Sequence, residues 1–218
     1  MNKIFIFLLL IFGIIKLSNS QYDNIMYYSV ATPTKMNVVY VGVGNPMNII
    51  AADIPADKMH VSISSGTISS TGPYNYIVKP NKSANSIIIS VSGEIDGVTK
   101  SFGSHKFRVK HIPNPTAEIA GMKGGTINKN LLAAQSGIIA ALDNFDFDIM
   151  FTIVSYTFSY TDSLYVNSIQ MNGNKFSQKI IDVIKKSEKG DKLYFEDIKA
   201  KGPDGEVRLL GSIRFIIN

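Results

Sequence analysis

The stretch LYFEDIKAKGPDGEVRLLGSIRFI, residues 193–216, decides how the end of the chain folds. Its centre is the sequence Gly-Pro-Asp-Gly at 202–205. Proline fixes φ at the first central position of a turn, aspartate suits the second, and glycine closes the turn. We therefore predict a hairpin whose strands are residues 193–200 and 206–216.

The rest of the second half is predicted to be mixed. Residues 128–142 carry apolar side chains at helical spacing, with Asn128 as N-cap. Residues 177–186 form a second predicted helix, capped by Ser177. Between them, residues 145–160 alternate as one long strand, with Phe145, Phe147, Ile149, Phe151 and Ile153 on one side. This half is expected to be an α+β domain with two helices and a C-terminal hairpin.

The first half reads as strands alone. Short runs rich in Val, Ile, Tyr and Ser are separated by Gly, Pro and Asn, and no run has a helical apolar stripe. The expected strands are residues 35–40, 59–64, 74–78, 86–95 and 97–109. Asp96-Gly97 suits a type I′ hairpin turn, because both residues tolerate positive φ. The pattern predicts an immunoglobulin-like antiparallel sandwich and a mainly β protein.

The N-terminus follows the plan of a secretory signal. Lys3 is followed by a twelve-residue apolar run at 4–15, too short for a membrane span. Ser18 and Ser20 place small side chains before a predicted cut between Ser20 and Gln21. We expect residues 1–20 to be a signal peptide and the mature protein to be exported, with an uncleaved signal anchor as the alternative.

Two prolines mark a domain boundary. Pro113 and Pro115 flank Asn114, where neither a strand nor a helix continues easily. The expected organisation is a sandwich domain at 21–112, a stiff linker at 113–115 and an α+β domain at 116–218.

Composition excludes several classes of function. The chain has no cysteine, which rules out thiol catalysis, disulfides and cysteine zinc sites. The formal charge is +5, and +3 once Lys3 and Lys16 are removed, too mild to indicate a nucleic-acid partner.

No residue pattern predicts a catalytic, cofactor or metal site. Asp143, Asp146 and Asp148 could ligate calcium but lack the glycine and glutamate of an EF-hand, so a strand face is the preferred interpretation. Glu196 and Asp197 are adjacent and are expected to point to opposite faces of a strand. The histidines, His60, His105 and His111, have no zinc-ligand spacing.

Three sequences together resemble one family. They are FRVKHIPNPTAEIAGMKGGTINK at 107–129, AALDNFDFDI at 140–149 and FEDIKAKGPDG at 195–205. In order and spacing they are similar to the end of GldM, or PorM, of the gliding-motility and type IX secretion apparatus of Bacteroidetes. The sandwich stands where the preceding β-domain of that family would stand.

The resemblance implies a non-catalytic periplasmic scaffold, possible homodimers, and contacts with secretion-ring subunits or a full-length GldM-like protein. Family members have a transmembrane helix and a long helical region before these domains, whereas a cleavable signal precedes them here, so coupling to the motor is in doubt. The residues that carry the resemblance, with a structural or interface role expected, are Asn144, Phe145, Asp146, Phe147, Asp148, Phe195, Glu196, Asp197, Gly202, Pro203, Asp204 and Gly205. We call them the motif residues.

Two rival functions remain. A secreted carbohydrate-binding or adhesion module would show a shallow aromatic groove, for which Tyr74, Tyr76, Tyr156 and Tyr160 are the candidates. A hydrolase is disfavoured, since no catalytic constellation is found.

Overall fold

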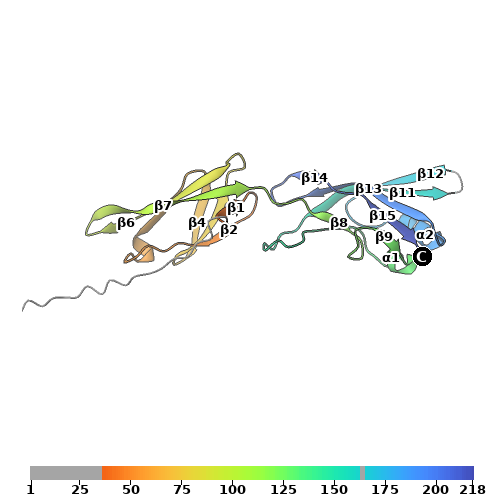
Figure 1. Cartoon of the computed structure of the whole chain (residues 1–218), viewed down its shortest axis with the longest axis horizontal. Helices are drawn as coiled ribbons and strands as arrows, with labels where there is room; N and C mark the ends of the chain where they lie inside the picture. The colour runs from red at the N-terminus through yellow and green to blue at the C-terminus, as the bar shows by residue number, and fades with distance from the viewer. Residues whose placement is uncertain (1–35, 163–164) are drawn as a thin grey trace, which may run out of the picture. The chain divides into compact units, whose positions relative to one another are not determined.

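The computed structural model describes residues 36–162 and 165–218 (Figure 1). The predicted signal peptide and its cut between Ser20 and Gln21 lie outside the described residues. None of the helices in the described ranges is long and apolar enough to span a membrane.

Two sheets form the first half. The larger has the order β1-β7-β6-β3 and the smaller β2-β5-β4. Their strands are β1 (Val38–Tyr40), β2 (Asn45–Asn48), β3 (Met59–Ile63), β4 (Gly66–Gly72), β5 (Asn75–Pro80), β6 (Ser86–Ile95) and β7 (Val98–Lys110), with a 3-10 helix η1 (Ala56–Lys58) before β3. Val39, Ile87 and Ile89 of the larger sheet pack with Val78 of the smaller. The predicted sandwich is confirmed, but it is not antiparallel throughout, because β1 pairs with β7 in parallel.

Individual strands of the sandwich differ in how well the sequence predicted them. β6 has the predicted bounds, and φ is positive at both Asp96 and Gly97, as a type I′ turn requires. β2 and β4 were missed. The first contains Pro46 and the second is the polar run GTISSTG, so neither carries the apolar alternation that marks a strand.

The second half is built on one larger sheet, of order β12-β11-β13-β15-β9, with β14 paired to β13. The strands are β9 (Gly125–Ile127), β11 (Thr152–Asp162), β12 (Tyr165–Asn172), β13 (Lys192–Lys201), β14 (Val207–Leu209) and β15 (Ile213–Ile217). A separate pair joins β8 (Thr116–Glu118) to β10 (Ile139–Ala141), and the helices are α1 (Lys129–Ala133) and α2 (Gln178–Lys186). The α+β prediction is confirmed.

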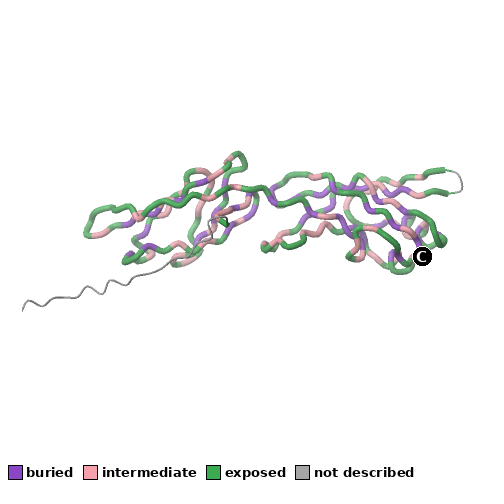
Figure 2. The backbone as a smooth tube through the Cα atoms, viewed as in Figure 1, coloured by how far each residue is buried: buried purple, intermediate pink, exposed green. Residues whose placement is uncertain are grey.

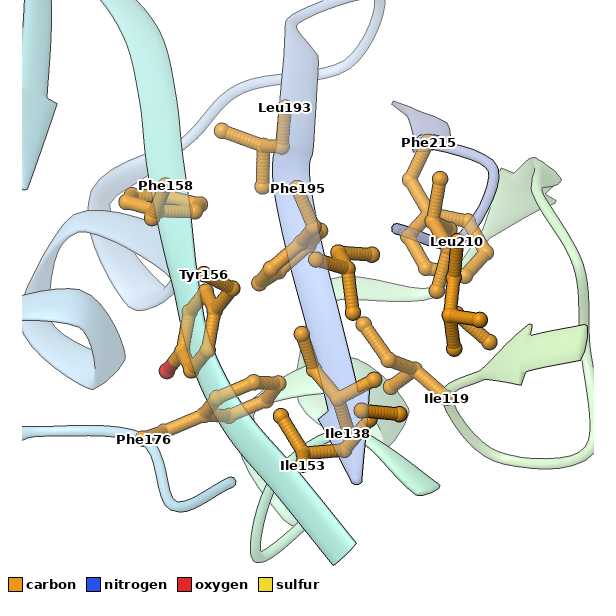
Figure 3. Close-up of a cluster of buried hydrophobic side chains, with 14 of the residues drawn as sticks. Ile119, Ile138, Ile153, Tyr156, Phe158, Phe176, Leu193, Phe195, Leu210 and Phe215 are labelled. Carbon is orange, nitrogen blue, oxygen red and sulfur yellow. The ribbon is translucent and has the colours of Figure 1, made fainter. Parts of the chain in front are cut away.

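Aromatic side chains fill the core of this second half. The Phe195 ring lies 5.1 Å from that of Phe158 and 5.4 Å from that of Phe176, measured between centroids. Tyr156 and Phe215 complete the cluster around it (Figure 3). Phe195 is fully buried, so this motif residue serves the core.

The first predicted helix is wrong over most of its length. Asn128 does cap it, since its side chain accepts hydrogen bonds from the backbone N–H of Asn130 and Leu131. However, α1 ends at Ala133. A Cβ on Gly137 would lie 2.7 Å from the Asn174 carbonyl carbon, and the Ile138 N–H donates to the Asn174 oxygen. This tertiary contact holds the chain extended and leads it into β10. The second helix matches its prediction, with Ser177 as N-cap.

The long strand predicted over 145–160 was also wrong in its bounds, because β11 begins only at Thr152. Its alternation is nevertheless present. Phe145, Phe147 and Ile149 are partly buried, whereas Asp146, Asp148 and Met150 are exposed. The segment 145–151 thus has no ladder partner among the described residues, and the Ile149 N–H donates to the Phe147 oxygen in a tight turn about Asp148. Figure 2 shows buried stretches interspersed with exposed ones along the strands of both halves.

The predicted hairpin forms with two changes. The Gly205 N–H donates to the Gly202 oxygen over 3.0 Å, which closes the predicted turn. The second strand is broken into β14 and β15. In β13, Asp197 has a φ of 50° and the pairing with β11 shifts register there. This bulge leaves both Glu196 and Asp197 outside the core, so the expectation of opposite faces is wrong.

Candidate functional site

The structured loop between β1 and β2 forms one side of the candidate site. Asn45 is 3% exposed and holds this loop from within. Its side-chain oxygen accepts from the Tyr40 N–H, and its amide nitrogen donates to the carbonyl oxygens of Tyr40, Val43 and Val78. Because all these groups are buried or partly buried, their hydrogen bonds stabilise this conformation of the loop.

The turn at 202–205 packs against that loop. Gly42 has a φ of 82°, and a Cβ there would lie 2.5 Å from the Asp204 Cα. The Lys82 ammonium, also from the sandwich, donates to the Asp204 backbone oxygen. The described residues belong to one compact unit of the chain. We call this contact of the loop 40–45 and Lys82 with the second half the junction.

A buried ion pair stabilises the turn at the junction. The Asp204 carboxylate accepts from the Glu206 N–H and from both terminal nitrogens of Arg208. The side chains of Asp204 and Arg208 are 0% and 9% exposed. The guanidinium carbon lies 5.1 Å from the centre of the Phe151 ring, a cation–π distance. Gly202 lacks a side chain where a Cβ would meet Arg208, Asp204 and Phe151.

The charges around Asp204 set its protonation state. Burial alone would raise the pKa of this carboxyl, but the hydrogen bonds from Arg208 and Glu206, with the positive charges of Arg208 and Lys82, outweigh it and lower the pKa below its usual value. The same pairing raises the pKa of Arg208. Both groups are therefore charged at neutral pH.

Aromatic contacts form the other part of the junction. The Tyr40 ring lies 4.9 Å from Phe145 and 5.5 Å from Phe147, both edge to face. Such pairs contribute about 0.5–1.5 kcal/mol beyond the area that they bury. Val43 belongs to the same buried cluster as Phe151 and Leu210. The loop thus packs into the core of the second half.

The motif residues therefore lie at several places. Phe145, Phe147 and the turn 202–205 contact the sandwich, Phe195 lies in the core, and Glu196 and Asp197 lie on the bulge. Asn144 has a φ of 53° at the start of the segment, and Asp146 and Asp148 are exposed along it.

The other predicted candidates are not brought together. Among residues 36–162 and 165–218 there is no group of three or more histidines and acids arranged to hold a metal. Asp143 instead pairs with Lys123, whose pKa rises through that hydrogen bond. His60, His105 and His111 are exposed on the sandwich or just after it.

The tyrosines proposed for an aromatic groove do not form a common one. Tyr156 is 2% exposed and its hydroxyl donates to the Lys175 oxygen inside the second half. Tyr160 stacks on Phe158 in that same core. Only Tyr74 and Tyr76 line one hollow, of about 280 Å³, and Tyr76 is itself 9% exposed.

From the sequence we did not single out the junction residues Tyr40, Gly42, Asn45, Lys82 and Arg208. The glycines of the short sequence Val-Gly-Val-Gly-Asn-Pro at 41–46 predict a tight loop, but the sequence does not indicate which turn that loop contacts. Arg208 stands four residues after Asp204, but that spacing brings side chains together on a helix, so in a hairpin it did not signal the ion pair.

Comparisons with known proteins match both halves. The model described as GldM third domain matches residues 28–110, and the model described as GldM C-terminal domain matches residues 113–218. A comparison with curated proteins gives no match.

A solved structure titled "Structural basis for Dscam isoform specificity" is similar to 84% of this chain, with 11% identity and a TM-score of 0.27. The match covers half of that chain, and at this score it carries no argument.

Replacing Asp204 tests the ion pair. We expect Asp204→Ala to lower the free energy of unfolding by about 3–5 kcal/mol at neutral pH, because it leaves Arg208 buried without its partner. The carboxyl has a lowered pKa when folded, so its contribution is present above the unfolded pKa of about 4 and is lost as the pH falls through the folded pKa. Urea unfolding at a series of pH values measures both effects.

Glu206→Gln is the control for this substitution. Glu206 is 44% exposed and lies 3.6 Å from Arg208, so its loss should cost less than about 1 kcal/mol. Equal losses for the two variants, or an Asp204→Ala effect that does not shrink in acid, would contradict the assignment.

Two glycines provide a matched test of the junction. Gly42→Ala and Gly97→Ala both place a side chain at positive φ, 82° and 74°, but only at Gly42 does the new Cβ meet Asp204. We expect Gly42→Ala to destabilise the chain by about 1–3 kcal/mol more, and to shift the NMR signals of Asp204 and Arg208. Equal thermal unfolding and unchanged signals would show that the loop and turn are not in contact.

Proposed function

Since the chain belongs to the GldM family of gliding-motility and type IX secretion proteins, we propose that it is a non-catalytic periplasmic scaffold or adaptor that binds other components of that machinery. Its partners under this proposal are secretion-ring subunits or a full-length GldM-like protein. Self-association into a homodimer is part of the same proposal.

The junction is the observation that supports a scaffold most strongly. The two family matches are separated by two residues only, yet the halves also share the Tyr40 aromatic contacts, the Gly42–Asp204 packing and the Lys82 hydrogen bond. A protein that transmits force or position between partners needs buried contacts of this kind beside its linker. The polar groups at the junction form hydrogen bonds and ion pairs with one another, which is consistent with a structural role for them.

The proposal includes the organisation expected from the sequence. A signal peptide at 1–20, cut before Gln21, would bring the chain to the periplasm, and domains at 21–112 and 116–218 would be joined at 113–115. The match boundary between residues 110 and 113 supports placing the joint at the two prolines.

A carbohydrate-binding module is the second candidate, favoured only by the hollow that Tyr74 and Tyr76 line. The Tyr74 hydroxyl already donates to the Ile54 oxygen, and Tyr76 is largely covered. Little aromatic face is therefore left for a sugar ring.

Capture from envelope extracts tests the scaffold. We expect tagged residues 21–218, after crosslinking in the native cells, to retain a type IX ring subunit or a GldM-like protein, identified by mass spectrometry. An unrelated periplasmic β-sandwich is the control bait. Enrichment of neither partner above that control would contradict the proposal, and binding to a glycan array would favour the second candidate.

A further inference from the structure

A groove lined largely by hydrophobic residues lies in the second half, and it shares Phe145, Phe147 and Phe151 with the junction. Its volume is about 520 Å³, within the range of ligand sites. The residues that line it come from β10 with its flanks Ile138 and Leu142, from Phe145 and residues 147–153, and from Asn174. Because neighbouring side chains of an extended chain point to opposite faces, a groove touched by all of residues 138–142 lies along the edge of β10.

Large apolar side chains remain exposed on both sides of this groove. Ile139 on β10 is 52% exposed, and Met150 on the facing segment is 88% exposed. Exposed apolar residues gathered along one groove, rather than scattered singly, are typical of a binding surface.

The backbone of β10 is open towards the groove. Ile139 and Ala141 pair with Glu118 and Thr116 of β8. The Ile138 N–H points the other way, to the Asn174 oxygen, so strand alternation turns the N–H and C=O of Ala140 away from β8 as well. Within residues 36–162 and 165–218, β10 has no second ladder partner, although residues 174–176 occupy the same edge up to Ile138 through the Gly137–Lys175 bridge and the hydrogen bond from the Phe176 N–H to the Ser136 oxygen. A donor and an acceptor are therefore available for one more strand.

The rim of the groove is acidic. Asp148 lines it, and Asp146, two residues earlier, is also exposed. Asp143 is neutralised by Lys123, whereas no ion pair of Asp146 or Asp148 occurs among the described residues. The negative rim favours a cationic occupant and disfavours phosphate groups and anionic lipids.

We propose that this groove receives an extended segment of a partner protein, which pairs with the free edge of β10. The segment carries alternating apolar side chains that cover Ile139 and Met150, and a lysine or arginine that meets Asp146 and Asp148. Main-chain hydrogen bonds to Ala140 provide affinity, and the apolar and basic side chains provide specificity. This proposal rests on the proposed scaffold function and assigns its docking surface.

Two capped peptides test the groove. Each alternates valine and threonine, and one carries lysine at both ends where the other carries glutamate. The protein used is the isotope-labelled chain of residues 21–218. We expect the lysine peptide to shift its backbone NMR signals in β10 and in residues 147–153. The glutamate peptide should bind about fivefold more weakly or worse, as one or two exposed charge pairs allow.

A charge reversal makes the test specific. In Asp148→Lys the preference should turn towards the glutamate peptide, whereas Asp57→Lys, at an exposed site on the sandwich, should leave it unchanged. The proposal is overturned if neither peptide shifts these signals, if both bind equally, or if the shifts fall on β12, the edge strand of the larger sheet. The proposal would also be overturned if the protein without peptide diffused as a dimer and Asp148→Lys abolished that dimer, because the groove would then bind a second copy of the chain.

Repeating the capture experiment with Asp148→Lys distinguishes failure of the groove proposal from failure of the scaffold proposal. If Asp148→Lys retains a type IX component as well as the unchanged chain does, the scaffold stands and the groove is not its docking surface. Suppose instead that no component is captured, that the unchanged chain prefers the lysine peptide and that Asp148→Lys prefers the glutamate peptide. The groove proposal then stands and the scaffold proposal fails.

Discussion

The buried ion pair between Asp204 and Arg208 is the interaction on which the junction depends. One carboxylate closes the turn through the Glu206 N–H and fixes Arg208, which in turn lies over Phe151. The backbone oxygen of Asp204 accepts a hydrogen bond from Lys82, and its Cα packs where Gly42 has no side chain. A buried pair of this kind adds little net stability compared with apolar packing, but its geometric demands leave few alternative arrangements. It thus fixes where the turn meets the sandwich.

The junction and the groove share side chains. Phe145 and Phe147 contact Tyr40 of the sandwich, and Phe151 lies beneath Arg208, while all three also line the groove. A segment bound in the groove would therefore touch the residues that connect the two halves. Under the proposed scaffold function, partner binding and the internal connection would then lie on one continuous packed region.

The features that depend on single residues and their immediate neighbours were predicted correctly from the sequence. The caps Asn128 and Ser177 and the two hairpin turns follow from the properties of single residues, and each is present. The helix over 128–142 failed because Gly137 approaches Asn174, a contact that the pattern of residues 128–142 does not contain. The junction could not be predicted, since Gly42 and Asp204 are joined only by folding. Among the motif residues, the sequence did not separate Phe195, which lies in the core, from Phe145 and Phe147, which contact the sandwich.

The central claim is that buried contacts around Asp204 hold the sandwich and the α+β domain as one body. Residual dipolar couplings, measured by NMR for backbone N–H groups in both domains, test it directly. The account predicts that β6 and β7 report the same alignment tensor as β11 and β13. Two tensors of different magnitude or orientation would show that the domains move independently, and would contradict it.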